Sequence, residues 1–422
     1  MKNDKRIIFY LGLFISASLI LIRDLAGIAI PGIVIAGWVG TICSIVNRKD
    51  MYLFAYSVLP LAVGVPGYTF LLLLLILLFR QEKLNARQII PFIILGCLEI
   101  VNVMGYSFYY DISGVVSFLS FLFLFFLMIF TEDSNIDRKQ CLLYYSLGLS
   151  FALVVAYGRI ILDSGFGALI AGELRAGAAM GNYEDEQLDN HLMMNANCIA
   201  YYSLTLLSLA VVFLSKKYNS RLLLYGFILI AIITGLLSFS RTWMLVTGII
   251  FIWFIMSNNR NKKTIVGFLL LFLLMTIIGA YIGLVDEVLQ VFEFRMENDN
   301  VESAGGRLPL FKAYHDFVTS NVYYIFFGTG ATYYKQVCQL WNSVHNGTQQ
   351  IFVSFGIVGL LTYLFAAKSF VKHYMNYRVK DNLILLTPFV TCLIFVQSIQ
   401  FLNPYPLMLP FVAAACALRI NE

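Results

Sequence analysis

The sequence predicts an all-α protein, a polytopic integral membrane bundle of helices. Apolar residues make up 60% of its 422 residues, mean hydropathy is +0.80, and charged residues are only 13%. A soluble domain would be about half apolar and about a quarter charged. The charges gather in short runs between long apolar blocks, which is typical of loops between membrane helices. The short alternating segments of a membrane β-barrel are not visible.

Apolar stretches of spanning length predict about 12–14 transmembrane helices. They lie at residues 7–22, 27–46, 51–64, 67–79, 88–105, 112–130, 141–161, 197–214, 221–237, 242–257, 264–284, 347–367, 383–400 and 404–420. The third and fourth are short, and Pro60, Pro66 and Gly67 lie between them. This pattern predicts a tight hairpin or a re-entrant pair over 51–79.

The distribution of positive charges predicts the orientation of the chain. With the N-terminus in the cytoplasm, cytoplasmic loops contain 21 of the 29 Lys and Arg residues, as the positive-inside rule requires. Both termini are then cytoplasmic. The basic start at residues 1–6 precedes an apolar run without a small-residue cleavage site, so we expect a retained first helix.

Two loops on the extracytoplasmic side are long. They divide the chain into N-terminal membrane helices (1–161), a first large loop (162–196), central membrane helices (197–284), a second large loop (285–346) and C-terminal membrane helices (347–422). Long loops in a compact protein are usually functional. We expect the two loops to meet over one cavity.

Three arginines are predicted on that extracytoplasmic face. Arg175 lies in the first loop, Arg241 between two apolar segments, and Arg307 after a glycine pair. Arginine binds phosphate oxygens in bidentate geometry and keeps its charge, so the three predict a clamp for a diphosphate. Snorkelling to the interface, or pairing with a carboxylate such as Glu173, is the alternative.

His345 directly precedes a predicted spanning helix and is followed by Asn346. A helix N-terminus disfavours the protonated imidazole, so His345 is a candidate proton acceptor. A polar cap at the water interface is the alternative. His191 and His315 are weaker candidates, and we interpret His373 as an ordinary cytoplasmic residue.

An amphipathic helix is predicted after Arg307, lying on the membrane or packing on the bundle. Its apolar side would hold Leu308, Phe311, Tyr314, Phe317 and Val318, and its polar side Lys312, His315 and Asp316. Pro309 is tolerated in the first turn of such a helix. Further on, Gly328-Thr329-Gly330 is a weak signal for backbone amides that bind a phosphate oxygen.

Glu99, Asn102 and Tyr106 share one face of a predicted membrane helix. A carboxyl group within the membrane suggests a functional site, and polar contacts between helices are the competing explanation. Cysteine and histidine spacings predict neither a disulfide framework nor a zinc site.

From about residue 172 to 367 the chain resembles the O-antigen ligase and Wzy-type polysaccharide polymerase superfamily. The resemblance is carried by motifs in a fixed order on the two large loops and the helices between them. They are Arg175, Asn195-Ala196-Asn197, Ser240-Arg241-Thr242, Arg307, Phe327-Gly328-Thr329-Gly330, His345-Asn346 and Gly356-Ile357-Val358-Gly359.

The resemblance implies a multi-pass glycosyltransferase of the bacterial plasma membrane with its active site on the extracytoplasmic side. The reaction implied is metal-independent and inverting, uses no cofactor, and transfers a sugar from a polyprenyl diphosphate. His345 would accept the proton, and Arg241 and Arg307 would stabilise the diphosphate. We expect further substrate contacts from Arg175, Lys312, Tyr314, Gly328, Gly330 and Asn346.

Three functions follow in order of preference. The first is a polymerase that joins polyprenyl-diphosphate-linked oligosaccharide units into a capsular or O-antigen polysaccharide. The second is a ligase that moves the finished glycan to lipid A-core or a protein. The third is a flippase, which would show short loops on both sides. Implied partners are the lipid-linked donor and acceptor, membrane lipid, and the flippase and chain-length regulator of the pathway, with no nucleic acid.

Overall fold

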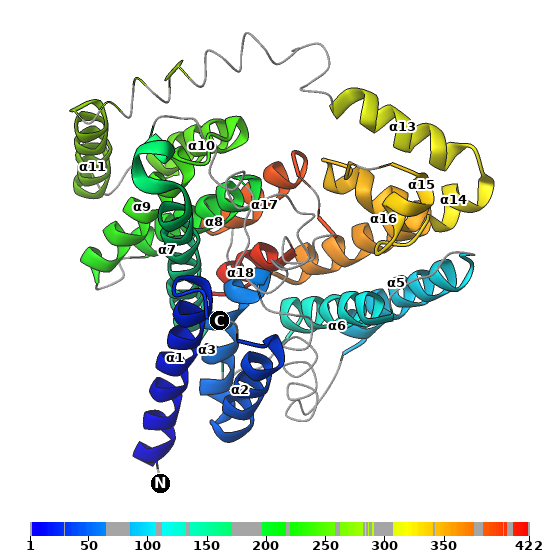
Figure 1. The fold of residues 1–422 in the computed structure, drawn as a ribbon, viewed down its shortest axis with the longest axis horizontal. Helices are drawn as coiled ribbons and strands as arrows, with labels where there is room; N and C mark the ends of the chain where they lie inside the picture. Colours follow the sequence, from blue (N-terminus) through cyan, green and yellow to red (C-terminus); the bar gives the residue numbers. More distant parts are fainter. Residues whose placement is uncertain are drawn as a thin grey trace.

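The computed structural model describes most of the chain, and the ordered structure in the described residues is helical. These residues are 2–28, 30–64, 85–106, 112–131, 136–170, 196–216, 220–257, 262–281, 307–340, 342–374, 383–399, 401–402 and 408–420, with single residues between 283 and 290. No strand occurs in those ranges, so the predicted all-α class is confirmed. Figure 1 shows the arrangement of the helices.

The helices follow the predicted apolar segments. The N-terminal half contains α1 (Lys2–Asp24), α2 (Gly32–Ile45), α3 (Arg48–Val58), the 3₁₀-helix η1 (Leu59–Gly64), α5 (Ala86–Met104), α6 (Ile112–Ile129), α7 (Arg138–Ile170) and α8 (Ala196–Ser215). The C-terminal half contains α9 (Arg221–Leu236), α10 (Arg241–Ser257), α11 (Lys262–Tyr281), α13 (Arg307–Thr319), α14 (Val322–Phe327), α15 (Tyr334–Cys338), α16 (Gly347–Tyr374), η5 (Leu383–Leu386), α17 (Thr387–Val396) and α18 (Leu409–Leu418). The predicted segment 67–79 lies outside the described residues.

Several of these helices are long and apolar enough to cross a membrane. Among the described residues they are five: Arg6–Asp24, Ala86–Met104, Arg138–Leu162, Asn197–Ser215 and Gly347–Phe370. Six further apolar helices are shorter, including α17 and α18. A ten-residue helix is about 15 Å long, half the hydrocarbon thickness, so these depend on neighbouring helices and adjoining turns. The lengths and composition confirm a helical membrane protein.

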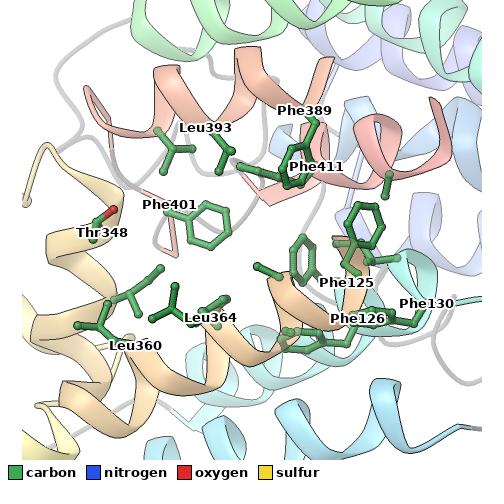
Figure 2. A pocket seen from close by; sticks show the side chains of 18 of the residues that line it. Phe125, Phe126, Phe130, Thr348, Leu360, Leu364, Phe389, Leu393, Phe401 and Phe411 are labelled. Carbon is green, nitrogen blue, oxygen red and sulfur yellow. The ribbon is translucent and has the colours of Figure 1, made fainter. Parts of the chain in front are cut away.

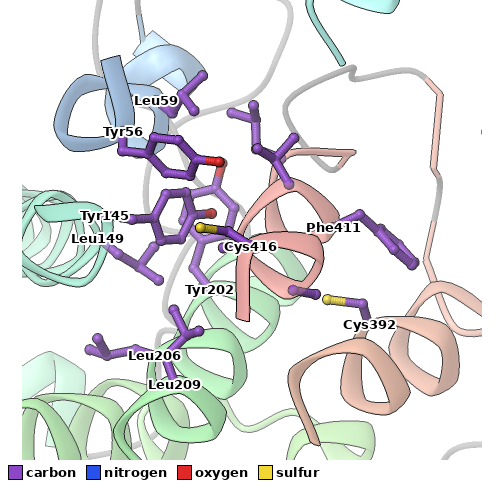
Figure 3. Close-up of a cluster of buried hydrophobic side chains, with 14 of the residues drawn as sticks. Tyr56, Leu59, Tyr145, Leu149, Tyr202, Leu206, Leu209, Cys392, Phe411 and Cys416 are labelled. Atoms are coloured by element: carbon purple, nitrogen blue, oxygen red, sulfur yellow. The ribbon is translucent and has the colours of Figure 1, made fainter. Parts of the chain in front are cut away.

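The core is built around α8, whose spanning stretch is 94% buried. Helices α7, α9, α10, α17 and α18 all pack against it. Figure 3 shows how Tyr145 of α7, Tyr202 of α8 and Cys416 of α18 approach one another in this core, beside Tyr56 of α3. Such dense packing stabilises helices in lipid, where van der Waals contact replaces the hydrophobic effect.

Glycine at position 148 allows α3 and α7 to pack closely. A Cβ added at Gly148 would lie 1.9 Å from the backbone oxygen of Ser57. We therefore expect Gly148→Ala to lower the free energy of unfolding by about 3 kcal/mol, because α3 and α7 must move apart. Thermal unfolding in detergent measures this. Gly226→Ala in α9 is the control, since no heavy atom lies within 4 Å of the added Cβ. Equal melting temperatures for the two variants would contradict the prediction.

The spanning helix before the first large loop ends close to the predicted residue 161. Helix α7 consists of two helical stretches that meet at a kink at Gly165, where φ is 80°, and its apolar spanning part is Arg138–Leu162. Glycine adopts this backbone without steric cost, which lets the chain change direction between the two stretches. Residues 171–195, including Arg175 and His191, lie outside the described residues.

Candidate functional site

Within the predicted second large loop, the described residues within 307–346 form a group of short helices before α16. We call residues 307–346 the outer segment; it contains α13, α14 and α15. Figure 1 shows these helices grouped around one end of α16, with α5 alongside. The described part of this loop is therefore mainly helical.

Helix α13 forms where the periodicity predicted it, and only part of its apolar side is buried. Tyr314 and Val318 are buried, whereas Leu308 and Phe311 are 57% and 44% exposed. Lys312, His315 and Asp316 are exposed as predicted. Leu310 completes the packed face instead. The buried stripe is shifted because the neighbouring α15 and α16, not the pattern alone, decide which apolar residues are covered.

A small core joins the helix that carries Arg307 to the chain around His345. Tyr314 and Val318 of α13 pack with Tyr334 and Cys338 of α15, Val344 and Val353. The Tyr314 hydroxyl donates to the Asn342 carbonyl at 2.7 Å, and the Gln349 side chain donates to the Phe311 carbonyl at 2.7 Å. Arg307 and His345 are thus held on one packed unit.

Burial keeps the titratable groups of this small core neutral. It raises the pKa of the Cys338 thiol to about 12 and raises the pKa of the Tyr314 hydroxyl above its usual value. Both groups stay protonated at neutral pH. Tyr314, predicted to bind substrate, is buried, and its hydroxyl supports the segment before His345.

The Gly328-Thr329-Gly330 sequence begins a turn that packs into a break in α16. We call residues 328–332 the glycine turn. Gly356 has φ 60° and interrupts α16, and the Val353 and Ser354 carbonyls accept the amides of Thr329 and Gly330 at 2.9 and 2.8 Å. The Gly328 amide donates to Tyr324. These amides are satisfied within the protein, so a phosphate contact at Gly328 or Gly330 would need other groups.

The polar face of α5 lies against the glycine turn. Fully buried Glu99 accepts the backbone N–H of Ala331 at 2.6 Å, that of Thr332 at 3.0 Å, and the Thr332 hydroxyl. Asn102 donates to the Phe327 carbonyl at 3.1 Å and accepts the Tyr323 hydroxyl at 3.0 Å. The predicted polar face therefore binds the outer segment.

The start of α16 carries a polar cluster next to His345. Asn346 caps the helix by accepting the Gln349 amide at 2.9 Å, and its side-chain nitrogen donates to the Gln397 carbonyl at 3.1 Å. The Thr348 hydroxyl donates to the Gln397 side chain at 3.1 Å. His345 is half-buried directly before this cap. The helix N-terminus gives the cluster a positive partial charge that favours anions.

An apolar cavity of about 230 Å³ begins at this polar cluster. Thr348 and Gln397 contribute polar groups to its lining. The other lining side chains are aliphatic or aromatic, from α6, α16, α17 and α18, with Phe130 and Phe401. Figure 2 shows the aromatic rings around it and Leu360, Leu364 and Leu393 on α16 and α17. Leu364 and Leu393 are 64% and 45% exposed, so the cavity opens to the protein surface. Its shape and lining suit a hydrocarbon chain.

Arg241 begins α10, directly after a tight turn. Phe239 in this turn has φ 49°, and a Cβ at Gly235 would lie 1.9 Å from the Trp243 ring. The Trp243 indole donates to the Ser203 hydroxyl at 2.7 Å, which fixes the first turn of α10 on α8. Helix α10 packs against α17, whose C-terminal neighbour Gln397 contacts Asn346. Arg241 itself is exposed.

Seven of the predicted site residues lie in the outer segment: Arg307, Lys312, Tyr314, Gly328, Gly330, His345 and Asn346. Arg241 begins α10, which packs against α17. The prediction missed Trp243, Gln349 and Gln397. A signal for Gln397 exists, since it is a polar residue within an apolar segment. Among the described residues, His, Cys, Asp and Glu do not gather in groups of three.

Comparison with known families identifies a match for the part of the chain that contains these residues. Residues 226–364 match the family model described as O-antigen ligase, about a third of the chain. No curated protein matches the chain. The matched segment contains Arg241, Arg307 and His345, and the resemblance to the O-antigen ligase and Wzy-type superfamily is confirmed. At a coarse level this implies glycosyltransferase-like chemistry on lipid-linked glycans in a multi-pass membrane protein.

Proposed function

We propose that this protein polymerises polyprenyl-diphosphate-linked oligosaccharide units into a capsular or O-antigen polysaccharide at the extracytoplasmic face of the bacterial plasma membrane. The reaction is a metal-independent, inverting glycosyl transfer. The observation that carries the proposal is the polar cluster of Asn346, Thr348 and Gln397 at the edge of an apolar cavity. A ligand that fills both has an anionic or polar head and a long hydrocarbon tail.

In this scheme, the hydroxyl oxygen of an acceptor sugar attacks the anomeric carbon of the donor. The new C–O bond forms as the bond from that carbon to the diphosphate breaks, and the diphosphate leaves on its lipid. His345 takes the hydroxyl proton. Arg241 and Arg307 stabilise the charge that develops on the diphosphate, and Arg175 assists in holding the phosphate or sugar.

Transfer of a finished glycan to lipid A-core or a protein is the second candidate. It is favoured by the description of the matching family, which is a ligase. Polymerase and ligase would use the same donor and the same arginine and histidine residues, so the acceptor distinguishes them.

The test uses purified full-length protein with a polyprenyl-diphosphate oligosaccharide as sole substrate, with and without EDTA. A ladder of longer lipid-linked products, unchanged by EDTA, is the result expected of a polymerase. Transfer that begins only after lipid A-core or protein is added would indicate a ligase. If no bond forms with any acceptor, the proposed function is wrong, and movement of the lipid across a bilayer would then be measured.

A substitution in the cavity lining tests whether the cavity holds the lipid tail of the donor. Leu393→Trp should raise the KM for a donor with a full-length isoprenoid about tenfold or more, because the ring takes space used by a few methylene groups, at about 0.8 kcal/mol each. A donor whose diphosphate carries only a methyl group should be unaffected, because Leu393 lies one helical turn from Gln397 and only a tail would reach it. Val390→Trp is the control on the same helix, exposed and outside the cavity lining. Equal effects on both donors would count against a tail in this cavity.

A further inference from the structure

We propose that Glu99 is a positioning residue for the candidate site. Its carboxylate holds the glycine turn, and through it the outer segment with Arg307 and His345, at a fixed place on the membrane bundle. The inference rests on the proposed function for the reaction that is positioned. It adds an anchor from α5, a helix that lies outside the matched residues 226–364.

A buried carboxylate within a membrane helix is costly unless its oxygens are hydrogen-bonded. Both oxygens of Glu99 accept hydrogen bonds from the glycine turn, from the amides of Ala331 and Thr332 and from the Thr332 hydroxyl. Three hydrogen bonds to one buried side chain therefore stabilise the turn in one place on α5.

The glycine turn packs closely against α5 at Gly330. A Cβ at Gly330 would lie 3.3 Å from Glu99 Oε2, from Asn102 Cβ and from the Tyr106 hydroxyl. Gly330 has φ 82°, which favours glycine. Asn102, one turn further along α5, holds the carbonyl of Phe327 just before the turn. Helix α5 is thus hydrogen-bonded to the chain before Thr329, at Phe327, and after it, at Ala331.

Packing within the outer segment connects the glycine turn with the candidate catalytic residues. Thr332 leads into α15, where Tyr334 and Cys338 pack against Tyr314 and Val344. Tyr314 is two helical turns from Arg307, and Val344 directly precedes His345. If the turn shifts on α5, these residues must shift with it or lose their packing.

The experiment compares Glu99→Gln with Gln88→Ala. Glutamine has only one acceptor oxygen, and its NH₂ group would face a backbone N–H. At least one of the two hydrogen bonds from the Ala331 and Thr332 backbone amides is therefore lost. Turnover should fall about 100-fold, the loss associated with small misplacement of a reacting group. The KM for the donor should stay within about threefold. Hydrogen exchange at Ala331 and Thr332 should accelerate.

Gln88 is a matched control because it is also fully buried on α5 and bonds a distant backbone, the Leu127 carbonyl at 3.1 Å. It lies at the opposite end of the helix from the turn. Gln88→Ala should lower the melting temperature at least as much as Glu99→Gln but leave turnover per folded protein near wild type. Equal loss of turnover in both variants would make Glu99 merely structural and overturn the proposal.

A double-mutant cycle provides a second test. If Glu99 acts through the turn, the double variant Glu99→Gln with Thr332→Val should lose little more turnover than Glu99→Gln alone. If the two residues acted independently, the free-energy losses of the two single variants would add. Unchanged exchange at Ala331 and Thr332 in Glu99→Gln would overturn the anchor even if the protein polymerises glycans. Lack of bond formation by wild type would instead overturn the proposed function, while the exchange measurement still reports on the anchor.

Discussion

Replacing His345 with alanine should lower the turnover of glycosidic bond formation by about 100- to 10,000-fold, the range for loss of a general base. Histidine is the side-chain type that exchanges a proton near neutral pH. His345 stands between buried Val344, which packs with Tyr314, and Asn346, which caps α16. The backbone on both sides is therefore fixed by its neighbours, and the variant should remain folded. Turnover and the KM for the donor are measured on detergent-purified protein.

His315→Ala is the control for the His345 variant. His315 is exposed on α13, where it lies 3.6 Å from the Asp316 carboxylate. Its loss should leave turnover unchanged. Added imidazole should restore part of the activity of His345→Ala, because it can accept the proton in place of the missing side chain. Full turnover in His345→Ala would show that another group accepts the proton, and the role given to His345 would be wrong.

The sequence predicts the membrane helices well for a physical reason. An apolar run of spanning length satisfies its own backbone hydrogen bonds as a helix and avoids the cost of exposing polar groups to lipid. The segments at 197–214 and 347–367 accordingly coincide with α8 and the first part of α16. Helix α8 begins at Ala196, one residue before the predicted segment 197–214.

Packing partners could not be predicted in the same way. Periodicity shows that α13 has an apolar side, but only the contacts with α15 and α16 leave Leu308 and Phe311 exposed. The hydrogen bond that the Ala331 amide donates to Glu99 joins residues 232 positions apart. A local pattern indicates that Glu99 is unusual in a membrane helix, but it contains no information about which backbone amides will satisfy it.

The break in α16 shows the structural role of Gly356, which the sequence alone did not reveal. Gly356 was part of a predicted motif without a stated role. Its φ of 60° and ψ of −155° lie in a region that is essentially restricted to glycine. A Cβ there would lie 2.4 Å from the backbone carbon of Phe326 in α14. The break leaves the Val353 and Ser354 carbonyls to accept Thr329 and Gly330.

Gly356→Ala should therefore disrupt the outer segment and abolish bond formation. The strained backbone alone costs about 1–3 kcal/mol, and the clash with α14 adds about as much again. If α16 instead becomes regular, its own amides recapture the two carbonyls and the glycine turn loses its partners. Either response should lower turnover more than 100-fold.

Hydrogen exchange at Thr329 and Gly330, together with thermal unfolding, should show where the structure is lost in Gly356→Ala. Gly248→Ala in α10 is the matched control, because its added Cβ would meet no atom within 4 Å. It should unfold at or above the wild-type temperature, since alanine favours a helix over glycine by about 1 kcal/mol. Wild-type exchange at Thr329 and Gly330 in Gly356→Ala would mean that the turn does not depend on the break. The anchor on α5 would then be sufficient to hold it.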